Sequence, residues 1–133
     1  MTGAEIVGTL LRASPPLAEK VVPANVKLGR LPDNVTLPAL LVRTVDVIER
    51  VMLKRGTSVR LVERVSVTVR ANSYREQVDT IRLVRSAVAG FIGDMEGAGR
   101  ISVTNAGTGP DLSGTGDSFE QAQDFRVTFD TAA

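Results

Sequence analysis

A long alternation of apolar and polar side chains over residues 59–71 constrains the fold of this chain more than any other feature. Apart from Glu63, the positions on one side are all aliphatic: Val59, Leu61, Val65, Val67, Val69 and Ala71. The positions on the other side are mostly polar: Arg60, Val62, Arg64, Ser66, Thr68 and Arg70. A period of two over this length predicts a long β-strand with one buried and one solvated face.

A second β pattern precedes this strand, and together they predict a long β-hairpin. Residues 39–53 are apolar on both alternating faces, which is typical of a strand covered on both sides for part of its length. The segment Lys54-Arg55-Gly56-Thr57 separates the two patterns and has the composition of a turn. The outer part of the hairpin is expected to project beyond the core as a ribbon.

Two capping boxes predict two helices. Thr2 precedes Glu5, and Ser73 precedes Glu76, by the three residues that this motif requires. Apolar residues then recur at helical spacing, first Ile6, Val7, Leu10 and Leu11, and later Val78, Ile81, Val84, Val88 and Phe91. Pro15 and Pro16 are expected to end the first helix, with one further turn over residues 17–22, and Gly90 and Gly93 to end the second.

The remaining strands are expected at residues 26–28, around Ile101 and Val103, and over 119–130. Eight of the twelve glycines fall between residues 90 and 116. Residues 105–118 carry almost no large apolar group, so they predict a flexible loop. The order α, β, β-hairpin, α, β, β over 133 residues predicts a single α+β domain, 1–133. Its sheet is antiparallel or mixed, with a long β-hairpin and two helices packed on one face.

The absence of cysteine, histidine and tryptophan excludes several classes of function. Thiol catalysis, zinc fingers, haem ligation and histidine acid–base chemistry all need one of the first two residue types. The segment 107–109 lacks the strand and helix of a phosphate-binding loop, and Asp111 and Asp117 are too few for a calcium loop. Asp94 and Glu96 have no cleft to fix their geometry. We therefore expect no enzyme, no metal and no cofactor.

The chain also shows no membrane or export pattern. No apolar run approaches the about 18 residues that a membrane-spanning helix needs. Glu5 precedes Arg12, the first basic residue, so the basic start of a signal peptide is missing. These features favour a soluble protein from a cytoplasm-like compartment.

The charges nearly cancel overall but are divided along the chain. Sixteen basic and 15 acidic residues leave a net charge of +1, which argues against a protein that coats nucleic acid. Residues 43–85 carry ten basic against five acidic residues, and residues 94–133 carry two against seven. Solvated faces would explain this division. Complementary patches for head-to-tail association of subunits would explain it as well. A third and weaker interpretation places Arg60, Arg64 and Arg70 against DNA.

Short motifs in a fixed order resemble one known family. They are Gly29-Arg30-Leu31-Pro32, Leu37-Pro38-Ala39-Leu40, Ala71-Asn72-Ser73-Tyr74, Arg82-Leu83-Val84-Arg85 and Gln123-Asp124-Phe125. Over nearly the whole chain, this order is similar to the tail-completion or tail-terminator proteins of long-tailed bacteriophages, prophages and gene transfer agents. The resemblance implies a small α+β structural protein without catalysis or cofactor.

In that family the subunits assemble as a hexameric ring at the head-proximal end of the tail. The ring stops polymerisation of the tail tube and provides the surface for head–tail joining. The implied partners are further copies of the chain, the tail tube protein and a head–tail connector or stopper protein, with no membrane and no sequence-specific nucleic acid. The implied location is the tail–neck region of the virion, after assembly in the host cytoplasm.

Two other functions stay open on the sequence. One is a head–tail adaptor or neck protein nearer the portal. The other is a small enzyme or ligand-binding domain, which would need a pocket lined by Asp46, Glu63 and the hairpin arginines. For the ring, the hairpin tip and the glycine-rich loop are the expected contact elements. The candidate interface residues are Arg50, Lys54, Arg55, Arg60, Arg64, Arg70, Asp111 and Asp117.

Overall fold

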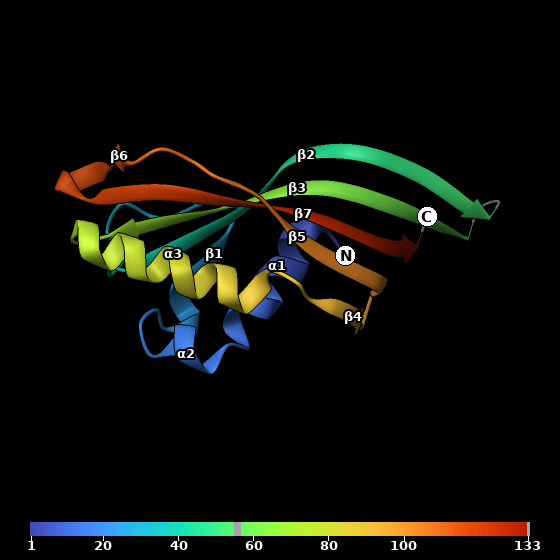
Figure 1. Cartoon of the computed structure of the whole chain (residues 1–133), viewed down its shortest axis with the longest axis horizontal. Coiled ribbons are helices and arrows are strands. Elements are labelled where there is room, and N and C mark those ends of the chain that lie inside the picture. The colour runs from blue at the N-terminus through green and yellow to red at the C-terminus, as the bar shows by residue number, and fades with distance from the viewer. Residues whose placement is uncertain (55–56, 133) are drawn as a thin grey trace.

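The computed structural model describes residues 1–54 and 57–132 and shows helices packed on one face of a twisted sheet (Figure 1). Within these residues the sheet has seven strands in the order β1-β2-β3-β7-β5-β4, with β6 paired to β7. The β1–β2 pair is parallel, and every other pair is antiparallel. The predicted α+β class with a mixed sheet and a long hairpin is confirmed.

The strands are β1 (Val26–Leu28), β2 (Ala39–Lys54), β3 (Ser58–Ala71), β4 (Ile92–Met95), β5 (Ala98–Thr108), β6 (Leu112–Ser113) and β7 (Phe119–Ala132). The helices are α1 (Gly3–Arg12), α2 (Pro15–Ala18) and α3 (Tyr74–Val88), with short 3-10 turns η1 (Pro23–Asn25) and η2 (Thr115–Asp117). We call the side of the sheet that α1 and α3 cover the helix face, and the other side the open face.

The predicted alternating strand is β3, which lies at the centre of the sheet. It pairs with β7 over its whole length, from Ser58 opposite Ala132 to Ala71 opposite Phe119, without a register shift. Its aliphatic residues point to the helix face and are buried, as the alternation predicts. Glu63, the exception in that row, is buried as well and is 4% exposed.

The N-terminus of α1 sits directly on this buried carboxylate. The backbone N–H of Gly3 donates to Oε1 of Glu63 at 2.9 Å, and the Thr44 hydroxyl donates to the same oxygen at 3.3 Å. The carboxylate thereby satisfies one of the N–H groups that a helix start leaves free. A Cβ on residue 3 would lie 2.8 Å from that oxygen, so the close approach requires glycine.

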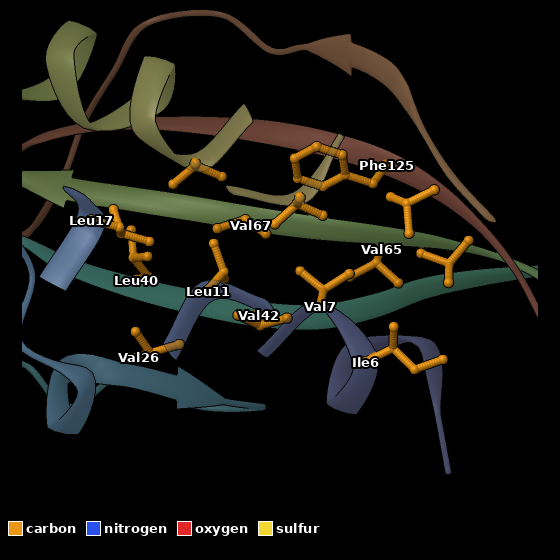
Figure 2. Close-up of a cluster of buried hydrophobic side chains, with 14 of the residues drawn as sticks. Ile6, Val7, Leu11, Leu17, Val26, Leu40, Val42, Val65, Val67 and Phe125 are labelled. Carbon is orange, nitrogen blue, oxygen red and sulfur yellow. The ribbon is translucent and has the colours of Figure 1, made fainter. Parts of the chain in front are cut away.

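The core lies between α1, α3 and the helix face of β2, β3 and β7. Figure 2 shows Ile6, Val7 and Leu11 of α1 directed at the sheet, among aliphatic residues of β2 and β3 and near Phe125 of β7. These α1 side chains are at most 1% exposed. Helical spacing in α1 and β alternation in β3 therefore meet in one buried layer.

Both predicted helix starts form with Thr2 and Ser73 as N-caps, although the glutamate side chains accept other donors than the N-cap N–H groups: Glu5 accepts from the Thr2 hydroxyl and Glu76 from the N–H of Asn72. The Thr2 and Ser73 hydroxyls accept the N–H groups of Glu5 and Glu76, at 3.2 and 3.1 Å. The first helix ends at Arg12, as the prolines predict. Pro15 and Pro16 then occupy the first turn of α2, where a missing N–H costs nothing. The further turn predicted over residues 17–22 therefore begins earlier, at Pro15, and forms the separate short helix α2.

Three strand segments differ from the prediction: β4, the end of β5, and β6, which lies inside the predicted loop 105–118 and pairs with the start of β7. Strand β4 was not expected, because its sequence IGDM is short and only Ile92 is a large β-branched residue. Strand β5 runs on to Thr108, so residues 105–108 belong to a strand and not to the predicted loop. Asn105 and Thr108 pair with Phe125 and Gln123 of β7. Backbone pairing needs no apolar side chains, which explains why composition alone missed this extension.

Replacing Val67 by aspartate is expected to prevent folding. Val67 is fully buried at the centre of β3, and an unpaired carboxylate there costs several kcal/mol out of a total stability of about 5–15 kcal/mol. Circular dichroism during thermal unfolding should show no cooperative transition for V67D. The matched control is Val22→Asp at a half-exposed valine, which should unfold like the parent chain. A cooperative transition in V67D would contradict the assigned core.

Candidate assembly surface

The outer half of β2 forms an uncovered apolar edge of the sheet. Strand β1 pairs with β2 only from Leu40 to Val42, and in the part of the chain that the structure describes no other strand flanks that side of β2. Two register shifts leave Val45 and Ile48 without partners on β3. Four β-branched side chains are 44–53% exposed along this edge: Val45, Val47, Ile48 and Val51. We call these four residues the β2 edge strip.

The β2 edge strip marks where the covering of β2 ends. Two-sided apolar character predicted a strand covered on both faces for part of its length, and the start of β2 is covered, with Leu40 and Val42 fully buried. Beyond Val42 the helices and β1 no longer accompany the strand, and Figure 1 shows the hairpin extending past them. The hairpin is not a free ribbon, because β7 pairs with β3 as far as Ser58 and Val59 is fully buried, but the apolar side chains on the outer half of β2 face solvent.

Three cross-strand ion pairs lie along the open face between β3 and β7. Arg60 contacts Asp130 at 2.6 Å, Arg64 contacts Asp124 at 2.8 Å, and Arg70 contacts Glu120 at 2.6 Å. The first and last pairs are directly opposite in the register, whereas Arg64 reaches Asp124 diagonally because Arg126 stands opposite it. We call this row the ion-pair ladder.

Asp130 is the carboxylate of the ion-pair ladder that accepts hydrogen bonds from two arginines. It accepts hydrogen bonds from Arg100 Nε at 2.5 Å and from Arg60 at 2.6 Å. The hydrogen bond from Arg100 and then that from Arg60 lower the pKa of Asp130 below its ordinary value, against the opposing effect of burial. The same contact raises the pKa of Arg100.

The ion-pair ladder changes how the divided charge is interpreted. The basic residues of the hairpin and the acidic residues of the C-terminal third face each other within one chain, because β3 and β7 are neighbours. Complementary charge therefore serves the fold of the subunit first. A role of Arg60, Arg64 and Arg70 in contacts with another molecule stays a prediction.

The other predicted interface residues lie at opposite ends of the molecule. Arg50 is exposed on the outer half of β2, which ends at Lys54, and Arg55 lies outside the described residues. Asp111 and Asp117 are exposed near β6, which lies at the end of the sheet opposite the hairpin tip (Figure 1). The structure brings these two acidic residues near each other but not near the hairpin arginines at positions 50 and 60.

A glutamine cluster of Gln77, Gln121 and Gln123 anchors the segment after β5, and it was hard to predict from the sequence. Gln77 of α3 is fully buried and donates through Nε2 to Asp111 at 2.8 Å and to Gln121 at 3.3 Å. Gln121 donates to the carbonyl of Gly109, and Gln123 donates to that of Gly107. The available signal was a glutamine among the apolar positions of a helix, four residues before Ile81.

The pocket that a small enzyme would need does not form. Glu63 lies on the helix face under α1, whereas Asp46 pairs with Arg64 in the register on the open face. A groove of about 300 Å³ exists elsewhere on the open face, between Leu31 and Leu112 over Arg43, Arg70 and Glu120. Within residues 1–54 and 57–132, no three acidic side chains group together to hold a metal ion. None of the described helices is long and apolar enough to cross a membrane.

The fold is similar to that of a chain in the solved structure described as "Virion of native gene transfer agent (GTA) particle". The match covers 93% of this chain and 91% of that chain, with a TM-score of 0.70 and 18% sequence identity. This similarity shows a shared fold over nearly the full length of both chains. No family model and no curated protein matches the sequence.

Replacing Asp130 by asparagine is expected to lower stability by less than about 1 kcal/mol at neutral pH, since its ion pairs are partly exposed. Because the folded-state pKa of Asp130 is lowered, its contribution is present above the ordinary aspartate pKa of about 4 and is lost as pH falls through the folded value. Urea unfolding of D130N and the parent chain should therefore differ at pH 7 and converge in acid, once the pH lies below the lowered folded-state pKa of Asp130. Asp117→Asn at an exposed position is the control, and a difference that persists in acid would contradict this assignment.

Replacing Gln77 by alanine is expected to release the segment after β5. The substitution removes the donor to Asp111 and Gln121 and should cost about 1–3 kcal/mol, because one hydrogen bond to a carboxylate and one to an amide are lost. Hydrogen exchange measured by mass spectrometry should rise at residues 107–113 and stay unchanged in β3. Ser86→Ala, at an exposed position of the same helix, is the control. Equal exchange at 107–113 in Q77A and S86A would show that the glutamine cluster does not hold this segment.

Proposed function

We propose that the chain is a structural subunit of a phage-like or gene transfer agent particle that forms a ring at the head-proximal end of the tail. The observation that carries the proposal is the fold similarity to a chain of a gene transfer agent virion, over 93% of this chain and 91% of that one. The order of short motifs along the sequence supports the same assignment. The ring ends tail-tube polymerisation and offers a surface for head–tail joining.

The monomer has features that suit a subunit of a ring. It leaves an apolar strand edge uncovered, which is unfavourable for an isolated soluble protein and is normally protected. A head-to-tail contact between identical subunits closes into a ring when its rotation permits, and the proposed ring is a hexamer. Work by assembly also needs no catalytic group, in agreement with the lack of histidine and cysteine.

The proposed contacts use both ends of the subunit. The hairpin with Arg50, Lys54 and Arg55, and the face with the ion-pair ladder, supply basic and apolar contacts. Asp111 and Asp117 supply acidic contacts at the other end. The proposed partners are further copies, the tail tube protein and a connector or stopper protein on the head side. The proposed location is the tail–neck region of a virion assembled in the host cytoplasm.

Adding the purified chain to polymerising tail tube protein of the same particle is expected to cap the tubes. Tube length in electron micrographs should fall as the chain is added, and a labelled chain should sit at one tube end only. Light scattering should give a ring-sized mass for the capping species. Arg64→Glu should weaken capping, because Arg64 is the most exposed arginine of the ion-pair ladder. Arg75→Glu, at a more exposed arginine on α3, should not.

The same experiment separates the ring proposed here from a head–tail adaptor. An adaptor would leave tube length unchanged and would bind the portal-side connector in a pull-down. Equal capping by R64E and R75E would show that the ion-pair ladder serves only the fold. A chain that neither caps tubes nor binds either neighbour would refute both functions.

A further inference from the structure

The part of the sheet that extends beyond the helices has two open edges, and we call this part the outer sector. Its strands are the outer half of β2, then β3, β7, β5 and β4 (Figure 1). Within residues 1–54 and 57–132, no strand flanks β2 beyond Val42 on its outer side or β4 on the side away from β5. Each edge therefore presents backbone N–H and C=O groups that a further strand could pair.

The two edges run in the same direction. All four pairings in this sector are antiparallel, and a row of five antiparallel strands begins and ends with strands of equal direction. If copies related by rotation about a ring axis stand side by side, β4 of one copy meets β2 of the next in a parallel pair. The structure thus specifies the direction of the junction as well as its position.

The two edges also lie at the same height in the sheet. Following the register from edge to edge, Ile92 is opposite Ser102, which is opposite Thr128, then Val62 and finally Glu49. Strand β4 is therefore level with the outer half of β2, which carries the β2 edge strip. Two copies placed side by side without an offset would bring these segments together.

Side chains on the two edges fit one another in character. The β2 edge strip is about half exposed, and Ile92 on β4 is 82% exposed, the largest value among the exposed large apolar residues. Residues 43–53 of β2 carry two basic and two acidic residues, Arg43, Arg50, Asp46 and Glu49, so their charges balance, and β4 and its turn carry Asp94 and Glu96. The match between the two edges is therefore apolar, because exposed apolar groups on one edge meet exposed apolar groups on the other.

We propose that the outer edge of β2 pairs in parallel with β4 of a second copy, so that one sheet continues from subunit to subunit. This inference rests on the ring of the proposed function and names its junction. A β2–β2 contact would leave both β4 edges open and would close as a dimer. Pairing β2 with β4 covers both edges of every subunit and can be repeated around a ring.

Engineered cysteines test the junction directly, because the chain has none of its own. Ile92→Cys is mixed, in separate samples, with Val45→Cys, Ile48→Cys or Val51→Cys, three positions that sample the register of a parallel pair. A disulfide forms only when the two Cβ atoms approach to about 4 Å. At least one mixture should give a disulfide-linked dimer, and I92C mixed with Tyr74→Cys, a control on α3, should give none.

A matched pair of valines tests the same edge without cysteine. Val47 and Val22 are each 53% exposed, and only Val47 belongs to the β2 edge strip. Val47→Lys should weaken self-association at least about tenfold by sedimentation, because a charged edge resists strand pairing. Val22→Lys should associate like the parent chain. Both variants should keep the parent thermal unfolding transition.

Several results would overturn the proposed junction. They are a parent chain that stays monomeric at every concentration, equal association of V47K and V22K, cross-linking of a β2 cysteine variant with itself alone, and associated samples in which no mixture cross-links. Failure of the proposed function would give a different combination of results in these experiments. Cross-linked rings that do not cap tubes would refute the tail role and keep the junction, whereas capped tubes without β2–β4 cross-links would refute the junction and keep the tail role.

Discussion

The full-length pairing of β3 with β7 is the interaction on which the rest of the structure depends. Fourteen consecutive residue pairs without a register shift hold two long strands at the centre of the sheet. One face of this pair buries most valines of β3, together with Phe125 and Phe129 of β7, beneath α1 and α3. The other face aligns arginines with carboxylates. A slip by one residue would exchange the two faces, so the register determines both the core and the charge pattern.

The same pairing explains why a nearly neutral chain has such unevenly divided charge. Basic residues concentrate in the hairpin and acidic residues in the last third, yet the fold makes β3 and β7 neighbours. Partly exposed ion pairs contribute little stability each, about 0–1 kcal/mol. Their cross-strand contacts fit the native register, in which Arg60 and Arg70 each stand directly opposite a carboxylate.

What the monomer leaves uncovered points to assembly. Register shifts at Val45 and Ile48 and the early end of β1 leave half of β2 with apolar side chains in solvent. At the other edge, Ile92 is uncovered as well. A protein with these edges gains from a partner that supplies a strand, which is the physical basis of the proposed ring.

Much of the fold could be predicted from local patterns in the sequence. Alternation identified β3, the capping boxes placed the starts of α1 and α3, and the prolines marked the end of α1. Strand β4 escaped prediction because it is short and has only one large β-branched residue. The extension of β5 and the glutamine cluster around Gln77 escaped it because they depend on backbone and amide hydrogen bonds between residues distant in sequence. The candidate arginines were recognised as an outward row, but their acidic partners were not.

The sequence by itself therefore determined the α+β class, the buried row of β3, the helix starts and the exclusion of histidine and cysteine chemistry. These follow from periodicity, capping and composition, which act over a few residues. Only the tertiary structure decided that β7 neutralises the arginines of β3 and that β2 is left open beyond Val42. These two features depend on the order of the strands in the sheet and on how far β1 and β7 extend along their neighbours. Contacts between residues more than 40 positions apart, such as those between β3 and β7, produce no local sequence pattern.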